Sequence, residues 1–255
     1  MIDAFDLQLR LGGTAVLSGA GLITRPGQMV GLVGPNGSGK SSLLRCLYGM
    51  LRPHGGAVLV DDRPLDALSR RSIARAIAVV TQETSTEGLT MSVGEFVLLG
   101  RHVHRGDHQG FTSDDRRVVV EALVRVGLGS MLERGVHELS GGERQRVMIA
   151  RCLAQQSKVM LLDEPTNHLD IRYQHEVLAL IRSLGLATIV VLHDLNLANR
   201  YCDQVVLLDR GCVVASGSPD TVLCSAILEP VFGVEVRRLV ADGTVHLALG
   251  PLPTA

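Results

Sequence analysis

The fold of this chain is decided by nine residues, GPNGSGKSS, at positions 34–42. An apolar run, MVGLV at residues 29–33, precedes them, and the helix pattern SSLLRCLYGML follows from Ser41. Residues 34–41 match G-x-x-x-x-G-K-[S/T] between a strand and a helix, the context in which this motif forms a phosphate-binding loop. The alternative, a chance glycine-rich turn, does not account for both flanks.

Each part of this stretch has an expected role in binding a nucleotide. The glycines let the backbone wrap around phosphates, the Lys40 ammonium reaches the β and γ groups, and the Ser41 hydroxyl ligates Mg²⁺. The expected nucleotide-binding residues here are Gly34, Pro35, Asn36, Gly37, Ser38, Gly39, Lys40, Ser41 and Ser42.

A second signal is VMLLDEP at residues 159–165, where an apolar run ends in two adjacent carboxylates. Open parallel sheets bind ligands at the carboxyl ends of their strands. We therefore expect Asp163 to hold the Mg²⁺ shell and Glu164 to polarise an attacking water. The alternative is that the two acids belong to a solvated turn, with Pro165 ending the strand. That alternative is weak in a chain that also has a phosphate-binding loop.

Two more polar residues follow apolar runs and are expected at the same sheet edge. His193 comes after TIVVL at residues 188–192, and Gln82 comes just after IAVV at residues 77–80. A lone histidine at a strand end is usually structural, whereas one that converges on a nucleotide can contact the γ-phosphate. Both residues are therefore candidates for the nucleotide site.

The stretch LSGGERQR, residues 139–146, resembles a second anion site, because small residues again precede a helix. Ser140 and Glu143 have the spacing of a capping box, which is the purely structural explanation. That explanation leaves Gly141 and Gly142 unexplained, since each glycine costs a helix roughly 1 kcal/mol relative to alanine. The pair indicates a ligand that must approach the backbone closely.

Short apolar runs alternate with helix patterns along the chain. Runs that are apolar on both faces are typical of buried parallel strands, and their alternation with helices predicts an α/β fold with a mostly parallel sheet. Asp209-Arg210-Gly211 predicts the turn of an antiparallel hairpin. The predicted strands cover residues 29–33, 77–80, 159–162, 188–192 and 205–208.

The segment between Glu83 and Glu138 has helix patterns and loops without a strong strand. We therefore expect one domain over residues 1–255, with an α/β core formed by residues 1–82 and about 155–255. A helical subdomain, about residues 83–154, is inserted into this core and carries LSGGE.

Composition narrows the functional class. With 255 residues and 46% apolar content the chain can fill a sizeable core, which excludes predominant disorder. A net charge of -1 with interspersed signs gives no footprint for nucleic acid. Neither a signal sequence nor an apolar run of about 20 residues is evident, so a cytosolic chain is expected.

Cysteines and histidines give no metal template. The five cysteines are scattered and lack C-x-x-C spacing, so neither a disulfide framework nor a zinc site is expected. His102, His104 and His108 lie with Asp107 in RHVHRGDHQG, which is typical of a solvated loop. Their spacing matches no ligand template, so metal binding there is not favoured.

With these residues assembled, the chain resembles an ATP-binding-cassette (ABC) ATPase along nearly its whole length. The family's P-loop NTPase fold has a mostly parallel core sheet, antiparallel β elements and an inserted helical subdomain. Its motifs occur here in the family's order. Walker A matches Gly34–Ser41, the Q-loop matches Gln82, the signature matches Leu139–Glu143, and Walker B matches Val159–Asp163. The catalytic glutamate matches Glu164, the D-loop matches NHLD ending at Asp170, and the switch histidine matches His193.

The resemblance implies ATP and Mg²⁺ as cofactors and a second copy of the chain as partner. In this family two cassettes bind head to tail, and each signature helix caps the ATP held by the other cassette. It implies that Ser140, Gly141, Gly142 and Asp170 serve the shared nucleotide sites, and that Gln82 joins the catalytic and metal groups. The second anion site would thus serve a partner molecule.

Further stretches resemble cassettes of importers for ferric siderophores, haem and cobalamin. The resemblance rests on MSVGEFVLLGR, LDIRYQHEVLALI, VLHDLNLANRYCDQVVLL and VFGVEV, of which the first lies where such ATPases meet the permease. It implies an ATPase on the cytoplasmic face of the membrane, bound to integral permease subunits and indirectly served by a substrate-binding protein. Ferric siderophore is the first expectation for the cargo, and haem or cobalamin the alternative.

A rival function is that of a soluble cassette that does not transport, such as an iron–sulfur cluster assembly factor. A DNA-repair cassette is disfavoured because the long coiled-coil insertion of that class is missing between the P-loop and the signature. Membrane association would distinguish the two functions, because a transport cassette should co-purify with an integral permease and an assembly factor should stay soluble.

The chain departs from the family where an aromatic ring usually stacks on adenine. The aligned stretch is LGGTAVL, with Leu11 in the aromatic position, and Phe5 is the only aromatic residue between Met1 and Tyr48. We expect Leu11 and Val16 to hold the base by aliphatic contact, with weak affinity and base selectivity.

Overall fold

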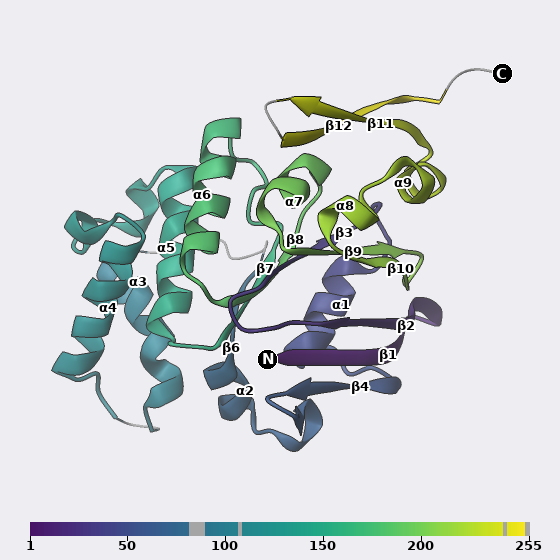
Figure 1. The fold of residues 1–255 in the computed structure, drawn as a ribbon. Coiled ribbons are helices and arrows are strands. Elements are labelled where there is room, and N and C mark those ends of the chain that lie inside the picture. Colours follow the sequence, from purple (N-terminus) through teal and green to yellow (C-terminus); the bar gives the residue numbers. More distant parts are fainter. Residues whose placement is uncertain (82–89, 107–108, 242–243, 253–255) are drawn as a thin grey trace. The chain divides into compact units, whose positions relative to one another are not determined.

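The computed structural model describes residues 1–81, 90–106, 109–241 and 244–252 (Figure 1). Contacts divide the chain into two compact units. The first consists of Met1–Leu68 and Ala187–Ala255, and the second of Ser69–Leu186.

The first unit contains most of the strands. Its strands are β1 (Ile2–Leu11), β2 (Thr14–Ile23), β3 (Met29–Val33), β4 (Gly55–Val60), β5 (Arg63–Pro64), β8 (Ala187–Val191), β9 (Gln204–Asp209), β10 (Cys212–Gly217), β11 (Val234–Ala241) and β12 (Thr244–Pro251). Its helices are α1 (Lys40–Leu47), the 3₁₀ turn η1 (Leu65–Ala67), α7 (Leu195–Tyr201), α8 (Pro219–Val222) and α9 (Ser225–Phe232).

The central strand of this unit is β3, which pairs in parallel with β8 on one side and β9 on the other. Every residue of β3 and β8 is buried, as the unbroken apolar runs predicted. β9 turns into antiparallel β10 through Arg210 and Gly211, whose φ angles of 46° and 80° suit a tight hairpin turn. The predicted strands and hairpin of this unit are confirmed.

A separate antiparallel sheet has the order β2-β1-β4-β5, and α1 packs against β1 and β2. Within β1, Ile2 and Ala4 are buried, and so are Leu7 and Leu9. The two pairs are out of phase because the register shifts at Asp6, which has a φ of 50°. This bulge hides the alternation that would have marked β1 as a half-buried strand.

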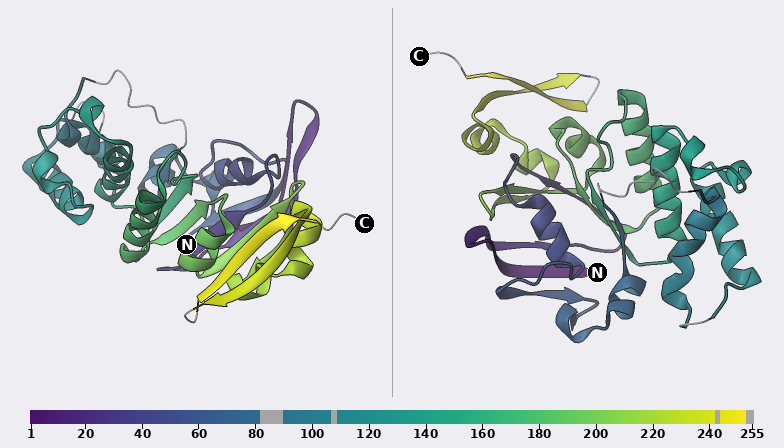
Figure 2. Two further views of the ribbon diagram at one scale, coloured as in Figure 1. Left: turned by 90° about the horizontal axis from the view of Figure 1, so that it is seen from above. Right: turned by 180° about the vertical axis from the view of Figure 1, so that it is seen from behind.

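The last two strands, β11 and β12, form an antiparallel hairpin, drawn in yellow in Figure 2. The amide of Asn196 in α7 exchanges two hydrogen bonds with the backbone of Leu247, at 2.7 and 3.1 Å. These bonds fasten β12 to the helix that follows β8.

The second unit is mainly helical. Its helices are α2 (Arg70–Ala76), α3 (Val93–Leu98), α4 (Ser113–Arg125), α5 (Gly141–Ala154) and α6 (Ile171–Ser183), with 3₁₀ turns η2 (Leu99–His104), η3 (Gly129–Met131) and η4 (Val136–Glu138). Its strands β6 (Ile77–Val80) and β7 (Val159–Asp163) pair in parallel.

Helices α3, α4 and α5 pack together, and α5 also packs against β6 and α6. The mixed α/β class with parallel and antiparallel strands is thus confirmed. The compact unit is larger than the expected helical subdomain of about residues 83–154, because β6, β7 and α6 cluster with these helices. The boundaries expected for that subdomain stay a prediction.

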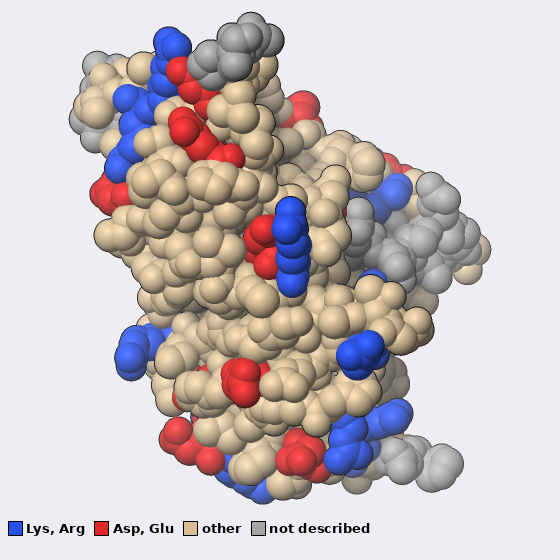
Figure 3. Space-filling view, turned by 90° about the vertical axis from the view of Figure 1, so that its right-hand side faces the viewer, with Lys and Arg blue, Asp and Glu red and all other residues tan. Residues whose placement is uncertain are grey.

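Figure 3 shows acidic and basic side chains interspersed on the face that it presents. This face therefore lacks the continuous basic surface that attracts a nucleic-acid backbone.

A buried ion pair ties the helices of the second unit together. The Asp115 carboxylate accepts hydrogen bonds from Arg101 Nε at 3.0 Å, from the Thr112 N–H at 2.8 Å, and from Arg105. Arg101 Nη1 also donates to the carbonyl oxygen of Ala154 at 2.7 Å, at the end of α5. Burial alone would raise the pKa of Asp115, but these hydrogen bonds outweigh it and hold that pKa well below its usual range.

We expect Asp115→Asn to lower the free energy of unfolding by about 3–5 kcal/mol at pH 7, because it leaves Arg101 buried without its counter-charge. Since the folded-state pKa of Asp115 is depressed, its stabilisation is present above the unfolded value of about 3.9 and is lost as the pH falls toward the folded value. The difference between wild type and variant should therefore shrink below about pH 4.

Urea unfolding of both proteins at pH 7 and pH 3 measures this difference. The matched control is Asp114→Asn, because Asp114 is exposed and pairs only at the surface with Arg117. Equal losses from the two variants, or a difference that grows on acidification, would contradict the proposed network.

Candidate functional site

The phosphate-binding loop is closed by two glycines that no other residue replaces. A Cβ at Gly34 would lie 2.0 Å from the Leu208 carbonyl oxygen, and one at Gly39 would lie 2.8 Å from the Val16 carbonyl oxygen. Their φ angles, 148° and 105°, are also in the region that L side chains avoid. The loop between β3 and α1 is thus packed tightly against β2 and the end of β9.

Two polar side chains lie beneath this loop. The Lys40 ammonium is buried and donates to the carbonyl oxygens of Gly34 and Pro35, at 2.8 and 2.9 Å. Ser38 Oγ is buried and has no hydrogen-bond partner in the described part of the chain. A cation and an orphaned hydroxyl under a glycine-rich loop fit a phosphate group.

The N-terminus of α1 completes this cradle. Its N-cap is Gly39, and among the described residues no side chain caps it and no acidic residue stands in its first turn. The positive end of the helix dipole at that turn favours an anion. The predicted stretch from Gly34 to Ser42 forms the loop between β3 and α1 and the start of α1, and its binding of phosphate stays a prediction.

The residues expected to hold the base lie on the β1–β2 hairpin. The carbonyl oxygen of Val16 lies so close to Gly39 of the loop that a Cβ at Gly39 would be only 2.8 Å from it. Leu11 lies at the hairpin end, beside the positive-φ pair Gly12 and Gly13, and is 43% exposed. The structure therefore brings Val16 to the phosphate loop and leaves Leu11 on the surface.

His193 lies at the sheet edge that carries the loop. The Leu192 N–H donates to the Leu32 carbonyl at 3.1 Å, so β8 ends beside the end of β3. The next residue, His193, is exposed, and Asp194 caps α7 by accepting from two backbone N–H groups. Its predicted contact with a γ-phosphate stays a prediction.

In the second unit, Asp163 is the last residue of β7 and Glu164 follows it. Asp163 is buried and Glu164 is half-buried. Gln82, expected after β6, lies outside the described residues. A hydroxyl and a carboxylate, Ser41 and Asp163, are the hard oxygen donors that Mg²⁺ prefers beside phosphates. The donor chemistry therefore fits this ion.

A tight turn follows Glu164. Glu164 and His168 have φ angles of 54° and 62°, and the Asn167 N–H donates to the Glu164 carbonyl at 3.2 Å. Asn167 Nδ2 also donates to Glu164 Oε2. Asp170, the expected D-loop residue, caps α6 by accepting from the Tyr173 N–H at 3.0 Å. Sequence reasoning gave Asn167 no role of its own, although asparagine is a recognised turn residue.

The signature stretch forms the capping box that its spacing predicted. Glu143 Oε2 accepts from the Ser140 N–H at 2.8 Å and from Ser140 Oγ at 2.7 Å. These hydrogen bonds, helped by Arg134 and Arg146, hold the pKa of Glu143 below its ordinary value.

The two signature glycines have different structural reasons. A Cβ at Gly142 would lie 2.9 Å from the Tyr173 ring of α6, so internal packing alone requires a glycine there. A Cβ at Gly141 would make an ordinary 3.7 Å contact with Leu169. Packing therefore explains Gly142 but not Gly141, and only Gly141 still supports the inference that a ligand approaches the backbone here.

A cavity of about 240 Å³ joins these elements of the second unit. The signature glycine Gly141, the acids Asp163 and Glu164, and the turn residues Asn167 and His168 all line it. The structure thus brings one signature residue and the paired carboxylates to a common space within this unit.

Comparison with known proteins gives the family. Residues 17–167 match the model of the ABC transporter family. The chain is 46% identical to the hemin import ATP-binding protein of Pseudomonas entomophila, over 92% of this chain and 94% of that protein. It is 40% identical to the cobalamin import ATP-binding protein of Halobacterium salinarum, over 99% of this chain and 64% of the relative. It is 39% identical to the achromobactin transport ATP-binding protein of Dickeya dadantii, over 98% and 88%.

Solved structures agree. A structure described as a metal-chelate type ABC transporter in an inward-facing conformation has a chain with a TM-score of 0.84 and 27% identity, covering 98% of this chain and 97% of that one. The dimeric cassette MJ0796 bound to ADP and Pi has a TM-score of 0.72 and 26% identity, covering 86% and 99%. By motif, fold and relatives, the chain belongs to the ABC transporter family as one of its ATP-binding, ATP-hydrolysing cassettes.

Proposed function

We propose that this chain is the ATP-hydrolysing subunit of an importer that takes up a metal chelate through a separate membrane permease. The observation that carries the proposal is its similarity, over 92% of its length, to a hemin import ATP-binding protein. No described helix has both the length and the apolar character needed to cross a bilayer. The names of the import relatives support placing the chain at the cytoplasmic face of the membrane, held there by the permease.

The cargo is proposed by class. The relatives quoted above are named for hemin, cobalamin and achromobactin, all metal complexes or their chelators. Ferric siderophore, the expectation from sequence, stays a prediction beside haem, which the name of the 46% identical relative favours. The cassette sits apart from the transport path, so its own residues carry little information on the cargo.

The site residues divide the work of hydrolysis as follows. Lys40 and the loop N–H groups bind the β and γ phosphates, and Glu164 accepts a proton from the attacking water. His193 contacts the γ-phosphate, and Gln82 is assigned a catalytic role as well. Ser41, Asp163 and Gln82 hold Mg²⁺, which neutralises charge on the phosphates when it is bound.

A second copy of the chain completes each nucleotide site in this proposal. Ser140 and Gly141 lie at the N-terminus of α5, whose dipole favours an anion, and an anion bound there would have to compete with the Glu143 carboxylate of the capping box. The head-to-tail dimer gives this second site a ligand, and the dimeric MJ0796 cassette supports that arrangement.

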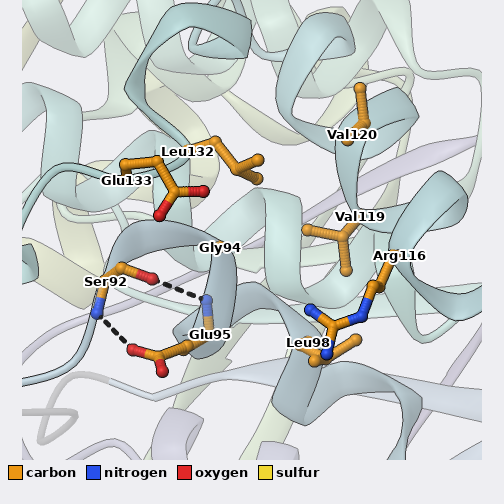
Figure 4. Close-up of a pocket in the computed structure, with 9 residues that line it drawn as sticks. All are labelled: Ser92, Gly94, Glu95, Leu98, Arg116, Val119, Val120, Leu132 and Glu133. Atoms are coloured by element: carbon orange, nitrogen blue, oxygen red, sulfur yellow. Dashed lines mark hydrogen bonds between the residues drawn. The ribbon is translucent and has the colours of Figure 1, made fainter. Parts of the chain in front are cut away.

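We assign the permease contact to a groove between α3 and α4. The groove has a volume of about 290 Å³ and is drawn in Figure 4. Val119 and Leu98 form part of its apolar wall, and Arg116 lies beside Leu98. The Ser92–Glu95 capping box, with hydrogen bonds of 2.7 and 3.2 Å, fixes the start of α3 along one side. Residues 91–101 are the stretch whose resemblance pointed to the permease.

The importer function is tested by uptake in cells that lack this gene. Wild type should restore uptake of one labelled chelate from a panel of haem, ferric siderophore and cobalamin, and Glu164→Gln should not. Val120→Glu places a charge in the groove, so uptake should fall at least about tenfold while the purified variant still hydrolyses ATP. Val120 is 43% exposed, so the change is tolerated by the fold.

The matched control is Val124→Glu, one turn along α4 and 62% exposed, but outside the groove. It should retain both uptake and hydrolysis. If uptake of every chelate is independent of the chain, the soluble non-transport alternative replaces the importer. If the two valine variants behave alike, the groove is not the permease contact.

The dimer is tested with the hydrolysis-deficient Glu164→Gln variant, in which ATP binding should survive and hydrolysis should fall by about 10²- to 10⁴-fold. This variant should dimerise with ATP and Mg²⁺ and revert to monomer with ADP. Adding Ser140→Arg should block the dimer, as should Gly141→Glu, which repels phosphate. Light scattering measures each state.

The two second-site changes control for folding. Ser140→Arg removes a helix cap, whereas Gly141→Glu adds a carboxylate to the first turn, which favours the helix. A Gly141→Glu double variant that still dimerises with ATP would exclude the shared site.

Leu11→Tyr is expected to tighten ATP binding by roughly 5- to 150-fold, because base–aromatic stacking contributes about 1–3 kcal/mol. Calorimetry with ATP and GTP measures the change, and Leu11→Met controls for bulk without a ring. Tight, ATP-selective binding by wild type would mean that another group holds the base.

A further inference from the structure

The turn after β7 brings an amide to the acid proposed as general base. Asn167 Nδ2 donates a hydrogen bond to Glu164 Oε2, and the two residues are three apart in sequence. Both side chains are half-buried, and both line the 240 Å³ cavity that also contains Gly141. The contact therefore lies in the space where the carboxylate would work.

The backbone makes this contact rigid. The Asn167 N–H donates to the Glu164 carbonyl at 3.2 Å, and Pro165 fixes its own φ inside the resulting turn. Gln174 of α6 holds the far side, donating to the carbonyl oxygens of Leu169 and Thr166 at 3.0 and 3.4 Å. The turn is thus fixed independently of the Asn167 side chain.

We infer that Asn167 is a positioning residue that holds the Glu164 carboxylate in the orientation from which it accepts a proton from water. This inference rests on the proposed role of Glu164 as general base. A glutamate side chain has three rotatable bonds, and a donor fixed on Oε2 restricts the directions in which the carboxylate can face. Losing that donor leaves the base chemically intact but poorly oriented, which lowers the rate without weakening ATP binding.

Steady-state ATP hydrolysis by wild type and three Asn167 variants tests the inference. Asn167→Leu has similar bulk without a donor, and its kcat should fall about 10- to 100-fold while the KM for ATP changes less than about threefold. Asn167→Ser keeps a short donor and should recover part of the loss. Asn167→Asp keeps the shape and the turn preference of asparagine but opposes one carboxylate with another, so its kcat should fall at least as far as that of Asn167→Leu.

A structural role gives the opposite order. If Asn167 only supports the turn, Asn167→Asp should stay near wild type, because aspartate favours the same turns. Gln174→Met is the matched control, since it removes hydrogen bonds from the same turn but none from Glu164. Its kcat should remain within about twofold of wild type, and a loss equal to that of Asn167→Leu overturns the inference. Thermal melting checks that every variant is folded.

A double-mutant cycle separates this inference from the proposed function. In the Glu164→Gln background, adding Asn167→Leu should change the residual rate by less than about twofold, because no carboxylate remains to orient. Independent, multiplicative losses overturn the inference. If Glu164→Gln alone retains wild-type hydrolysis, the role of Glu164 fails, and the inference fails with it. If Glu164→Gln is inactive and Asn167→Leu is fully active, the inference fails alone.

Discussion

The buried ammonium of Lys40 is the interaction on which the nucleotide loop depends. A buried cation must be surrounded by acceptors, and here the carbonyl oxygens of Gly34 and Pro35 bend over it. The loop can bend so tightly only because Gly34 and Gly39 lack a Cβ, since one would collide with the carbonyl oxygens of Leu208 and Val16. The same two glycines therefore allow the loop to pack against the end of β9 and against β2.

Much of this arrangement is predictable from sequence because it depends on local constraints. The unbroken apolar runs located β3, β6, β7, β8 and β9 to within one or two residues, since strands buried on both faces leave no other pattern. The residue pattern did not reveal strand β1 of the antiparallel sheet, because the bulge at Asp6 shifts the alternation of buried and exposed residues between Ala4 and Leu7. Bulges arise from pairing between strands, and a single strand's residue pattern does not encode them.

The site residues that belong to a sequence motif could be predicted from the sequence. The contacts that these residues make by packing against distant parts of the chain could not. Gly142 resembles a ligand-contacting glycine in sequence, but the Tyr173 ring, about thirty residues away, already excludes a side chain there. Leu11 and Val16 lie on the two strands of one hairpin, yet the Val16 carbonyl approaches Gly39 of the phosphate loop while Leu11 is exposed. Both outcomes depend on neighbours that are distant in sequence.

The paired acids of β7 pose a geometric problem that the backbone solves. Consecutive residues of a strand point to opposite faces, so a regular strand cannot present Asp163 and Glu164 to one space. Both nevertheless line the same cavity. The φ of 54° at Glu164 ends the strand at that residue and redirects its side chain. A left-handed conformation costs a residue other than glycine about 1–2 kcal/mol, and glycine would remove the cost together with the carboxylate. The strain thus coincides with the residue that turns a second carboxylate toward the first, and hydrogen bonds from Asn167 and Gln174 hold the turn that follows.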